Sequence, residues 1–224
     1  LVLLYGIGQN LKFLDEIARF YVRDGYAILG IEQLGQGERK PKQKQTPLQG
    51  LLSLRQRSGQ TIVETKRVVD FLETRPEVDM DHLYLFGVSM GAMMGASALA
   101  MEPRFDGGIL MWGGGDLPKM VSENRNAKIE MKPYQRWLAA AAATLFKPVE
   151  PLKRIAQISP RPLLFQNALH DEIVPKVCTE AYYERAGEPK EILWYDCGHE
   201  NGLNEQLIRQ IIGDQIDWLK TLTG

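Results

Sequence analysis

This chain of 224 residues lacks the marks of a disulfide-rich, a membrane-spanning or a nucleic-acid-binding protein. Its two cysteines, Cys178 and Cys197, are too few for a disulfide framework, and we expect two separate reduced thiols. No apolar run approaches the roughly 20 residues that a helix needs to cross a bilayer. The formal net charge is only -1, so the overall field attracts neither nucleic acid nor a membrane surface. What is left is an ordinary globular protein, which we expect in the cytoplasm.

The pattern of apolar residues predicts a single α/β domain over residues 1–224. Segments of strand length alternate with amphipathic helical segments, which is typical of a parallel sheet with helices on both faces. We expect helices from Asn10 to Gly25, from Thr61 to Arg75, and near both 92–101 and 204–221. The expected strands cover residues 1–4, 26–31, 83–88, 108–112, 162–167 and 192–195.

The most informative motif is Gly87-Val88-Ser89-Met90-Gly91, which lies between a strand-like apolar run and a helical run rich in Ala and Met. A serine at such a junction sits on a tight turn that exposes its hydroxyl, and Gly87 and Gly91 let neighbouring backbone approach closely. The Met90 amide begins the helix, where it can stabilise an oxyanion. The motif favours a nucleophilic serine over the alternative, a glycine-bounded turn without chemistry.

Two later loops contain the partners that such a serine needs. Asp171 follows the apolar strand at 162–167, and His199 follows the next strand at 192–195. Both loops leave the carboxyl ends of parallel strands, which is the edge of the sheet where Ser89 lies. A histidine can take the serine proton at neutral pH and return it to a leaving group. A carboxylate on the far ring nitrogen fixes the tautomer of that histidine.

The order serine, acid, histidine after these strands resembles the α/β-hydrolase superfamily, and the resemblance covers nearly the whole chain. It implies a three-layer sandwich with a mostly parallel sheet of about six strands. It also implies Ser89 as the nucleophile, Asp171 as the orienting acid and His199 as the general base, with no cofactor and no metal. The family usually has one or two further strands before residues 1–4, so we expect either a cropped chain or a reduced fold.

Other residues of the same types are alternatives for these roles. Asp116 is the main rival for the acid, because some family members carry the acid one strand earlier. Glu172, which we expect to face solvent, and Asp196, which we expect to end its strand, are weaker rivals. His82 precedes its strand and so lies at the wrong end of the sheet, and we expect His170 to shape the acid loop or to face solvent.

The loop Tyr5-Gly6-Ile7-Gly8 resembles the family's His-Gly-x-Gly loop, with Tyr5 in place of the histidine. The resemblance implies that the backbone amide of Ile7 is the second oxyanion donor beside Met90. Tyr5, Trp112 and Trp137 are expected to line the substrate pocket.

Two segments are candidates for setting specificity. Residues 34–60 carry six basic residues against one acid, which favours a solvated loop, with binding of an anionic substrate or partner as the alternative. Residues 116–156 lie where the family has its cap, and we expect a small helical insertion there. Its helix at 133–146 carries an apolar stripe that either packs against the protein or lines the pocket.

These features predict a serine hydrolase that cleaves carboxylic esters with small to medium apolar acyl groups through an acyl-enzyme intermediate. An acyltransferase or serine peptidase with the same triad, and a non-catalytic binding protein of the same fold, are the alternatives. The expected partner is a small-molecule ester, and the sequence leaves the oligomeric state open.

Overall fold

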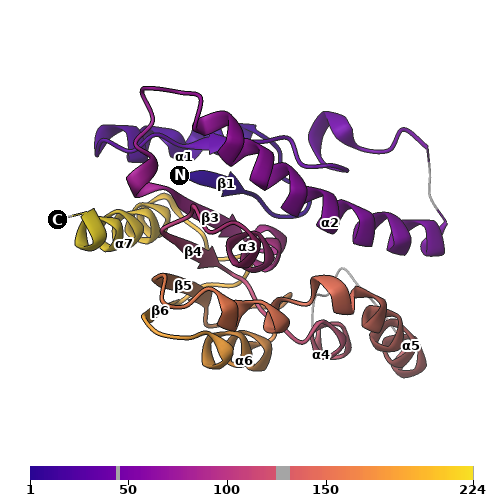
Figure 1. Cartoon of the computed structure of the whole chain (residues 1–224). Helices are drawn as coiled ribbons and strands as arrows, with labels where there is room; N and C mark the ends of the chain where they lie inside the picture. Colours follow the sequence, from indigo (N-terminus) through magenta and orange to yellow (C-terminus); the bar gives the residue numbers. More distant parts are fainter. Residues whose placement is uncertain (44–45, 125–131, 224) are drawn as a thin grey trace.

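A six-stranded sheet forms the centre of the protein, and all of its neighbouring strands are parallel (Figure 1). The computed structural model describes residues 1–43, 46–124 and 132–223. The strands lie in the order β2-β1-β3-β4-β5-β6. Their bounds are β1 (Val2–Leu4), β2 (Leu29–Gly30), β3 (Tyr84–Val88), β4 (Gly107–Met111), β5 (Leu163–Ala168) and β6 (Lys190–Tyr195).

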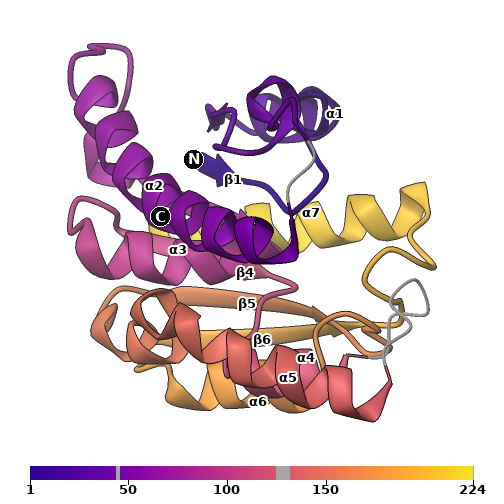
Figure 2. The same cartoon turned by 90° about the vertical axis from the view of Figure 1, so that its right-hand side faces the viewer.

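Helices cover both faces of this sheet, so the predicted three-layer α/β fold is confirmed (Figure 2). α1 and α7 pack on one face, and α2, α3 and α6 pack on the other. None of the described helices is both long enough and apolar enough to cross a membrane. The helix bounds are α1 (Lys12–Arg23), α2 (Pro47–Leu72), α3 (Met90–Met101), α4 (Leu117–Glu123), α5 (Pro133–Ala143), α6 (Lys176–Arg185) and α7 (Glu205–Thr223).

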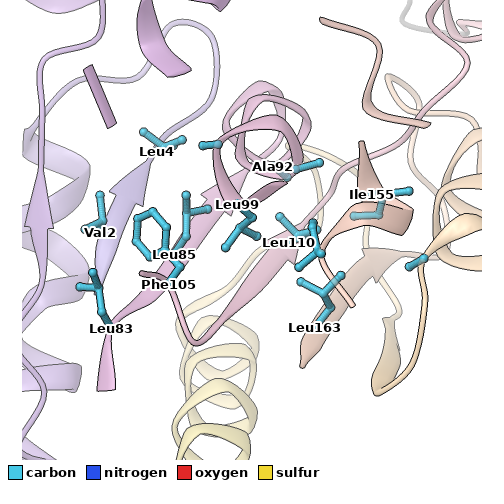
Figure 3. Packing of buried hydrophobic residues seen from close by; sticks show 14 of the residues in the cluster. Val2, Leu4, Leu83, Leu85, Ala92, Leu99, Phe105, Leu110, Ile155 and Leu163 are labelled. Carbon is cyan, nitrogen blue, oxygen red and sulfur yellow. The ribbon is translucent and has the colours of Figure 1, made fainter. Parts of the chain in front are cut away.

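The central strands are apolar on both faces, as expected for a parallel sheet that is covered on both sides. Leu85 of β3 and Leu110 of β4 belong to the cluster under α2 and α3, part of which is drawn in Figure 3. Their chain neighbours Phe86 and Ile109 belong to the cluster under α1 and α7. This alternation follows from the two-residue period of a strand.

Two predicted elements differ from the structure. The strand expected at 26–31 is reduced to Leu29–Gly30 at the edge of the sheet. The helix expected from Thr61 already begins at Pro47, so the prediction of a loop over 34–60 is wrong for residues 47–60. Thr46 caps this helix, because its side chain accepts a hydrogen bond from the Gln49 amide while the Gln49 side chain accepts one from the Thr46 amide. Residues 44–45 of the expected loop lie outside the described residues.

Both cysteines are free and buried. Burial raises the pKa of the Cys178 thiol to about 12 and also raises the pKa of the Cys197 thiol. Because the thiolate is the reactive form, neither group has the environment of a reactive cysteine.

Candidate active site

Ser89 occupies the turn between β3 and α3. Its backbone has φ 54° and ψ −117°, in a region that residues with a Cβ rarely adopt. The Ser89 amide donates a hydrogen bond of 2.8 Å to the carbonyl oxygen of Met111, which ties the turn to β4. A strained residue that the surrounding structure holds in place is typical of a functional position.

The glycines on either side of Ser89 are required by close packing, as the sequence predicts. A Cβ on Gly91 would collide with the carbonyl oxygen of Leu4, and one on Gly87 would lie 2.6 Å from the carbonyl oxygen of Gly91. A Cβ on Gly6 would lie 3.1 Å from the Cβ of Ser89. The close approach of α3 to the end of β1 therefore brings the loop at residues 5–9 next to Ser89.

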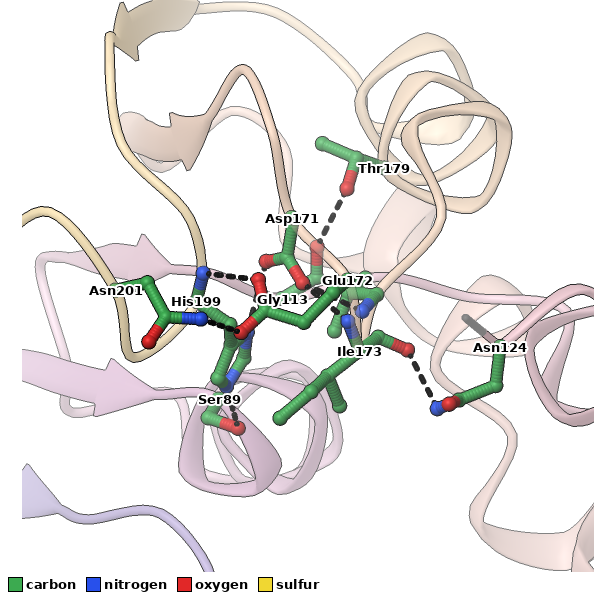
Figure 4. Close-up of polar contacts among 10 residues, drawn as sticks. Ser89, Gly113, Asn124, Asp171, Glu172, Ile173, Thr179, His199 and Asn201 are labelled. Atoms are coloured by element: carbon green, nitrogen blue, oxygen red, sulfur yellow. Dashed lines mark hydrogen bonds and ion pairs between the residues drawn. The ribbon is translucent and has the colours of Figure 1, made fainter. Parts of the chain in front are cut away.

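Three side chains that are far apart in the sequence meet at this edge of the sheet (Figure 4). His199 Nε2 lies 2.9 Å from Ser89 Oγ, and His199 Nδ1 lies 2.7 Å from Asp171 Oδ2. The side chains of His199 and Asp171 are only 8% and 7% exposed. Hydrogen bonds that are shielded from water in this way are electrostatically stronger than exposed ones.

Backbone amides fix the carboxylate of Asp171. Its Oδ1 accepts hydrogen bonds from the amides of Ile173 at 2.8 Å and Val174 at 2.7 Å, while Oδ2 faces His199. The carboxylate therefore cannot rotate away from the imidazole without losing two further hydrogen bonds.

Glu172 holds the loop that carries His199. Its Oε2 accepts a hydrogen bond of 3.0 Å from the His199 amide, and its Oε1 accepts one of 2.9 Å from Asn201 Nδ2 (Figure 4). The expectation that Glu172 simply faces solvent is wrong, because both of its carboxylate oxygens are bonded within the protein. A Cβ on Gly198 would lie 2.7 Å from Glu172 Oε2, so the glycine makes room for this contact.

The alternative acids and histidines have other partners. Asp116 caps α4 by accepting a hydrogen bond of 3.2 Å from the Lys119 amide. His170 Nε2 lies 2.9 Å from Asp196 Oδ1 on the surface. His82 precedes β3 and pairs with Asp79 at 2.6 Å, at the opposite end of the strand from Ser89.

Two buried glutamines that sequence reasoning missed hold the loop at residues 5–9. Gln36 Oε1 accepts a hydrogen bond from the Gly8 amide, and Gln36 Nε2 donates one to the carbonyl oxygen of Gly6, each at 2.8 Å. These two hydrogen bonds fix the backbone on both sides of Ile7. Gln33 Nε2 donates a hydrogen bond of 2.8 Å to the carbonyl oxygen of Tyr5, at the start of the same loop.

Tyr5 does not line the cavity at Ser89, which corrects the prediction that it contributes to the substrate pocket. Its side chain is fully buried, and its hydroxyl donates a hydrogen bond of 2.6 Å to Glu32 Oε1 and accepts one from the Gln33 amide. Burial and the nearby carboxylate raise the pKa of Tyr5 well above its usual value. Tyr5 therefore anchors the loop to the segment after β2.

A cavity of about 570 Å³ opens beside Ser89 and His199, between α1 and α7. Trp112 lines this cavity, and its ring centroid lies 5.7 Å from that of His199. Trp137 does not line it, which corrects the prediction for this residue: Trp137 lies on α5 and is 71% exposed. The apolar residues of the lining are Ile7, Phe13, Ile17, Phe20, Phe86, Val88, Met111, Trp112, Leu203, Ile208, Ile211 and Ile212.

Within residues 1–43, 46–124 and 132–223, no group of three or more His, Cys, Asp or Glu side chains could hold a metal ion. Ser89, His199 and Asp171 place a hydroxyl, an imidazole and a carboxylate in one hydrogen-bonded series at this edge of the sheet.

Solved structures share this fold at low sequence identity. The acetyl xylan esterase from Paenibacillus sp. R4 is 20% identical with a TM-score of 0.73, over 96% of this chain and 73% of that one. The acetyl xylan esterase 1 from Thermoanaerobacterium sp. JW/SL YS485 is 18% identical with a TM-score of 0.71, over 96% and 74%. The α/β hydrolase GrgF from Penicillium sp. sh18 is 18% identical with a TM-score of 0.70, over 98% and 88%.

The comparison with curated proteins found no match. A family model does match: Hydrolase_4, described as serine aminopeptidase, S33, covers residues 1–159, which is well over half of the chain. With its parallel sheet and its match to this model, the chain belongs to the Hydrolase_4 family of α/β-hydrolases.

Proposed function

We propose that this protein is a serine hydrolase that cleaves carboxylic esters with apolar acyl groups through an acyl-enzyme intermediate. The observation that carries the proposal is the pair of short contacts from Ser89 Oγ to His199 Nε2 and from His199 Nδ1 to Asp171 Oδ2. A serine hydroxyl is a weak nucleophile, and a base at hydrogen-bond distance removes that limitation.

In the proposed reaction, His199 Nε2 accepts the proton of Ser89 as Oγ attacks the ester carbonyl carbon. The imidazolium formed is stabilised by Asp171, and it then gives its proton to the departing alcohol oxygen. A water molecule then attacks the acyl carbonyl carbon while it loses a proton to His199 Nε2. The bond between the acyl carbon and Ser89 Oγ breaks, His199 returns its proton to Oγ, and the carboxylic acid is released. Asp171, which is fixed by two backbone amides, keeps the imidazole in the tautomer that this cycle requires.

We assign the oxyanion to the backbone amides of Ile7 and Met90. Met90 is the first residue of α3, where a helix leaves its N–H groups without partners within the helix. Ile7 lies between the two backbone groups that Gln36 grips, in a loop that contacts Ser89 through Gly6. Loss of one such donor typically costs about 2.7–4 kcal/mol of transition-state stabilisation.

We also propose that the chain forms one domain, with residues 116–156 as a small helical cap-like insertion. α4 and α5 lie next to each other in this segment, and Arg136 of α5 donates a hydrogen bond of 2.6 Å to the carbonyl oxygen of Asn124 after α4. The substrate partner is a small-molecule ester. The two buried free thiols suit a reducing compartment such as the cytoplasm.

Peptide hydrolysis is the alternative to ester hydrolysis as the function of this site, since the family description names an aminopeptidase. The predominantly apolar cavity favours an uncharged acyl group. The two activities are separated by measuring p-nitrophenyl esters and aminoacyl p-nitroanilides side by side. Preference for the anilides would replace the esterase proposal by a peptidase with the same residues.

The direct test of the nucleophile replaces Ser89. We expect Ser89→Ala to lower kcat for p-nitrophenyl esters by about 10⁴–10⁶. Ser97→Ala is the matched control, because Ser97 is a buried serine of α3, the helix that follows Ser89, and it should retain full activity. Ester hydrolysis that persists in a folded Ser89→Ala protein would refute the assignment.

A further inference from the structure

The cavity beside Ser89 has the form of a groove between α1 and α7. Side-chain contacts between the two helices close its far end. The Tyr21 hydroxyl near the end of α1 donates a hydrogen bond to Gln215 Oε1 of α7. Asp24 just after α1 pairs with Lys220 of α7 at 2.8 Å. Figure 2 shows α7, in yellow, passing below α1. The two helices are thus joined near their C-terminal ends, and the groove between them opens toward Ser89.

The walls and floor of this groove are apolar. Ile17 of α1 and Ile212 of α7 face it from its two sides, and both are almost fully buried. Phe86 and Met111 of the sheet form its floor. At the closed end lies Gln215, whose Nε2 donates a hydrogen bond of 2.5 Å to Gln166 Oε1. The polar group at this end is thereby satisfied within the protein and does not require a polar ligand.

Charge is confined to the rim of the groove. Glu16, Arg19, Glu200 and Glu205 line it, and all four are exposed. The guanidinium Cζ atoms of Arg19 and Arg209 lie 4.9 Å and 5.5 Å from the ring centroid of Phe20. These two cationic groups therefore stack on Phe20 at the rim and do not enter the groove. An apolar interior with a charged rim suits an uncharged aliphatic chain better than a charged ligand.

We propose that this groove binds the acyl chain of the substrate, and that the preferred substrates are esters of unbranched, medium-length aliphatic acids. This inference rests on the proposed ester hydrolysis and names the substrate class of the same site. A volume of about 570 Å³ is far larger than an acetyl group needs, and it falls in the range of pockets that enclose whole ligands.

The order in which the two halves of the ester leave Ser89 favours the acyl half as the occupant. The acyl group stays bonded to Ser89 at the mouth of the groove from the first attack until water releases it. The alcohol leaves after the first half-reaction, so contacts with it contribute to the first transition state alone. An acyl chain in the groove, by contrast, is held through both half-reactions, so its contacts contribute to both transition states.

The test narrows the groove with a tryptophan at Ile208, a lining residue that is 37% exposed and therefore tolerant of a larger side chain. We expect the wild-type protein to cleave p-nitrophenyl octanoate with a higher kcat/KM than the acetate. In Ile208→Trp the ratio of octanoate to acetate kcat/KM should fall about tenfold or more. Gln206→Trp is the matched control at an exposed position of the same helix outside the groove, and it should leave both rates unchanged.

A second pair of substrates distinguishes the two halves of the ester. The Ile208→Trp change should slow ethyl octanoate and not octyl acetate. Slowing of octyl acetate alone would show that the groove holds the alcohol and would overturn the inference, as would an unchanged ratio in the first series. In those cases Ser89-dependent cleavage of p-nitrophenyl acetate would leave the proposed function standing, whereas no cleavage of any ester would overturn both.

Discussion

Helices on the two sides of Ser89 carry similar apolar stripes, but the stripes on one side enclose a groove and the stripe on the other side faces solvent. On the α1–α7 side, apolar residues face each other across a gap over the sheet and enclose a groove that reaches Ser89 and His199. On the α4–α5 side, the stripe of α5 turns outward: Tyr134, Trp137 and Leu138 of α5 are exposed, as is Leu145 just after its end. An apolar stripe becomes a binding site only where a second element stands opposite it at the right distance.

The largest expected effect separates two acids, one on the loop that leads to α6 and one at the start of α4. Asp171→Asn should lower kcat by about 10⁴, because an asparagine favours the wrong tautomer of His199. Asp116→Asn should stay within about tenfold of wild type, since Asp116 only caps α4. Both are measured with one p-nitrophenyl ester at saturating concentration. The opposite ranking would move the acid to the α4–α5 side.

An intermediate effect is expected at the loop near α1. Gln36→Leu removes both hydrogen bonds that grip the backbone around Ile7, so the Ile7 amide should lose its fixed position. We expect kcat to fall about 10–100-fold with little change in KM, less than the loss of a whole donor. The exposed Gln43→Leu is the control for the substitution itself. A change in KM alone would contradict a role in stabilising the transition state.

The smallest effect is expected on the α4–α5 side. Trp137→Ala removes a large side chain that is mostly in solvent, so the free energy of unfolding should change by less than about 0.5 kcal/mol. Activity toward acetyl and octanoyl esters should stay within about twofold. Urea unfolding and the two kcat/KM values check this expectation. A tenfold loss of activity would mean that the outward stripe contributes to the substrate site.

The candidate site at the edge of the sheet could be predicted from the sequence, because each of its polar residues follows an apolar strand. Ser89 follows β3 directly, and Asp171 and His199 lie in the loops that follow β5 and β6. Parallel strands bring their carboxyl ends to one edge. The shared direction of the predicted strands thus indicates which loops lie at the same edge. It also explains why His82, at the start of β3, lies away from them.

The N-terminal half of α2 was predictable from a signal that the sequence contains. Thr46-Pro47-Leu48-Gln49 has the pattern of a capping box with proline at the first helical position, and the structure contains that cap. The basic residues and Gly50 and Gly59 nearby suggest a loop instead. A Cβ built on Gly50 or on Gly59 would have no atom within 4 Å. Neither glycine is therefore needed for close packing, and both lie within the helix.

The groove and the glutamine contacts could not be predicted in the same way. Gln36 meets Gly6 and Gly8 across about thirty residues of chain, and such contacts depend on how two loops settle together. The separation of α1 from α7 depends on side chains at one end, including Tyr21 and Gln215. Sequence periodicity identifies the apolar face of each helix and contains no information on the distance between two helices.

The central claim, that Ser89 is an activated nucleophile, is tested most directly by a fluorophosphonate probe, which reacts with activated serines. Intact-protein mass spectrometry of the treated wild-type protein should show a single adduct, and peptide mapping should place it on Ser89. Ser89→Ala should show none, and Asp171→Asn should react far more slowly than wild type. A folded wild-type protein that forms no adduct, or forms one on another residue, would contradict this account.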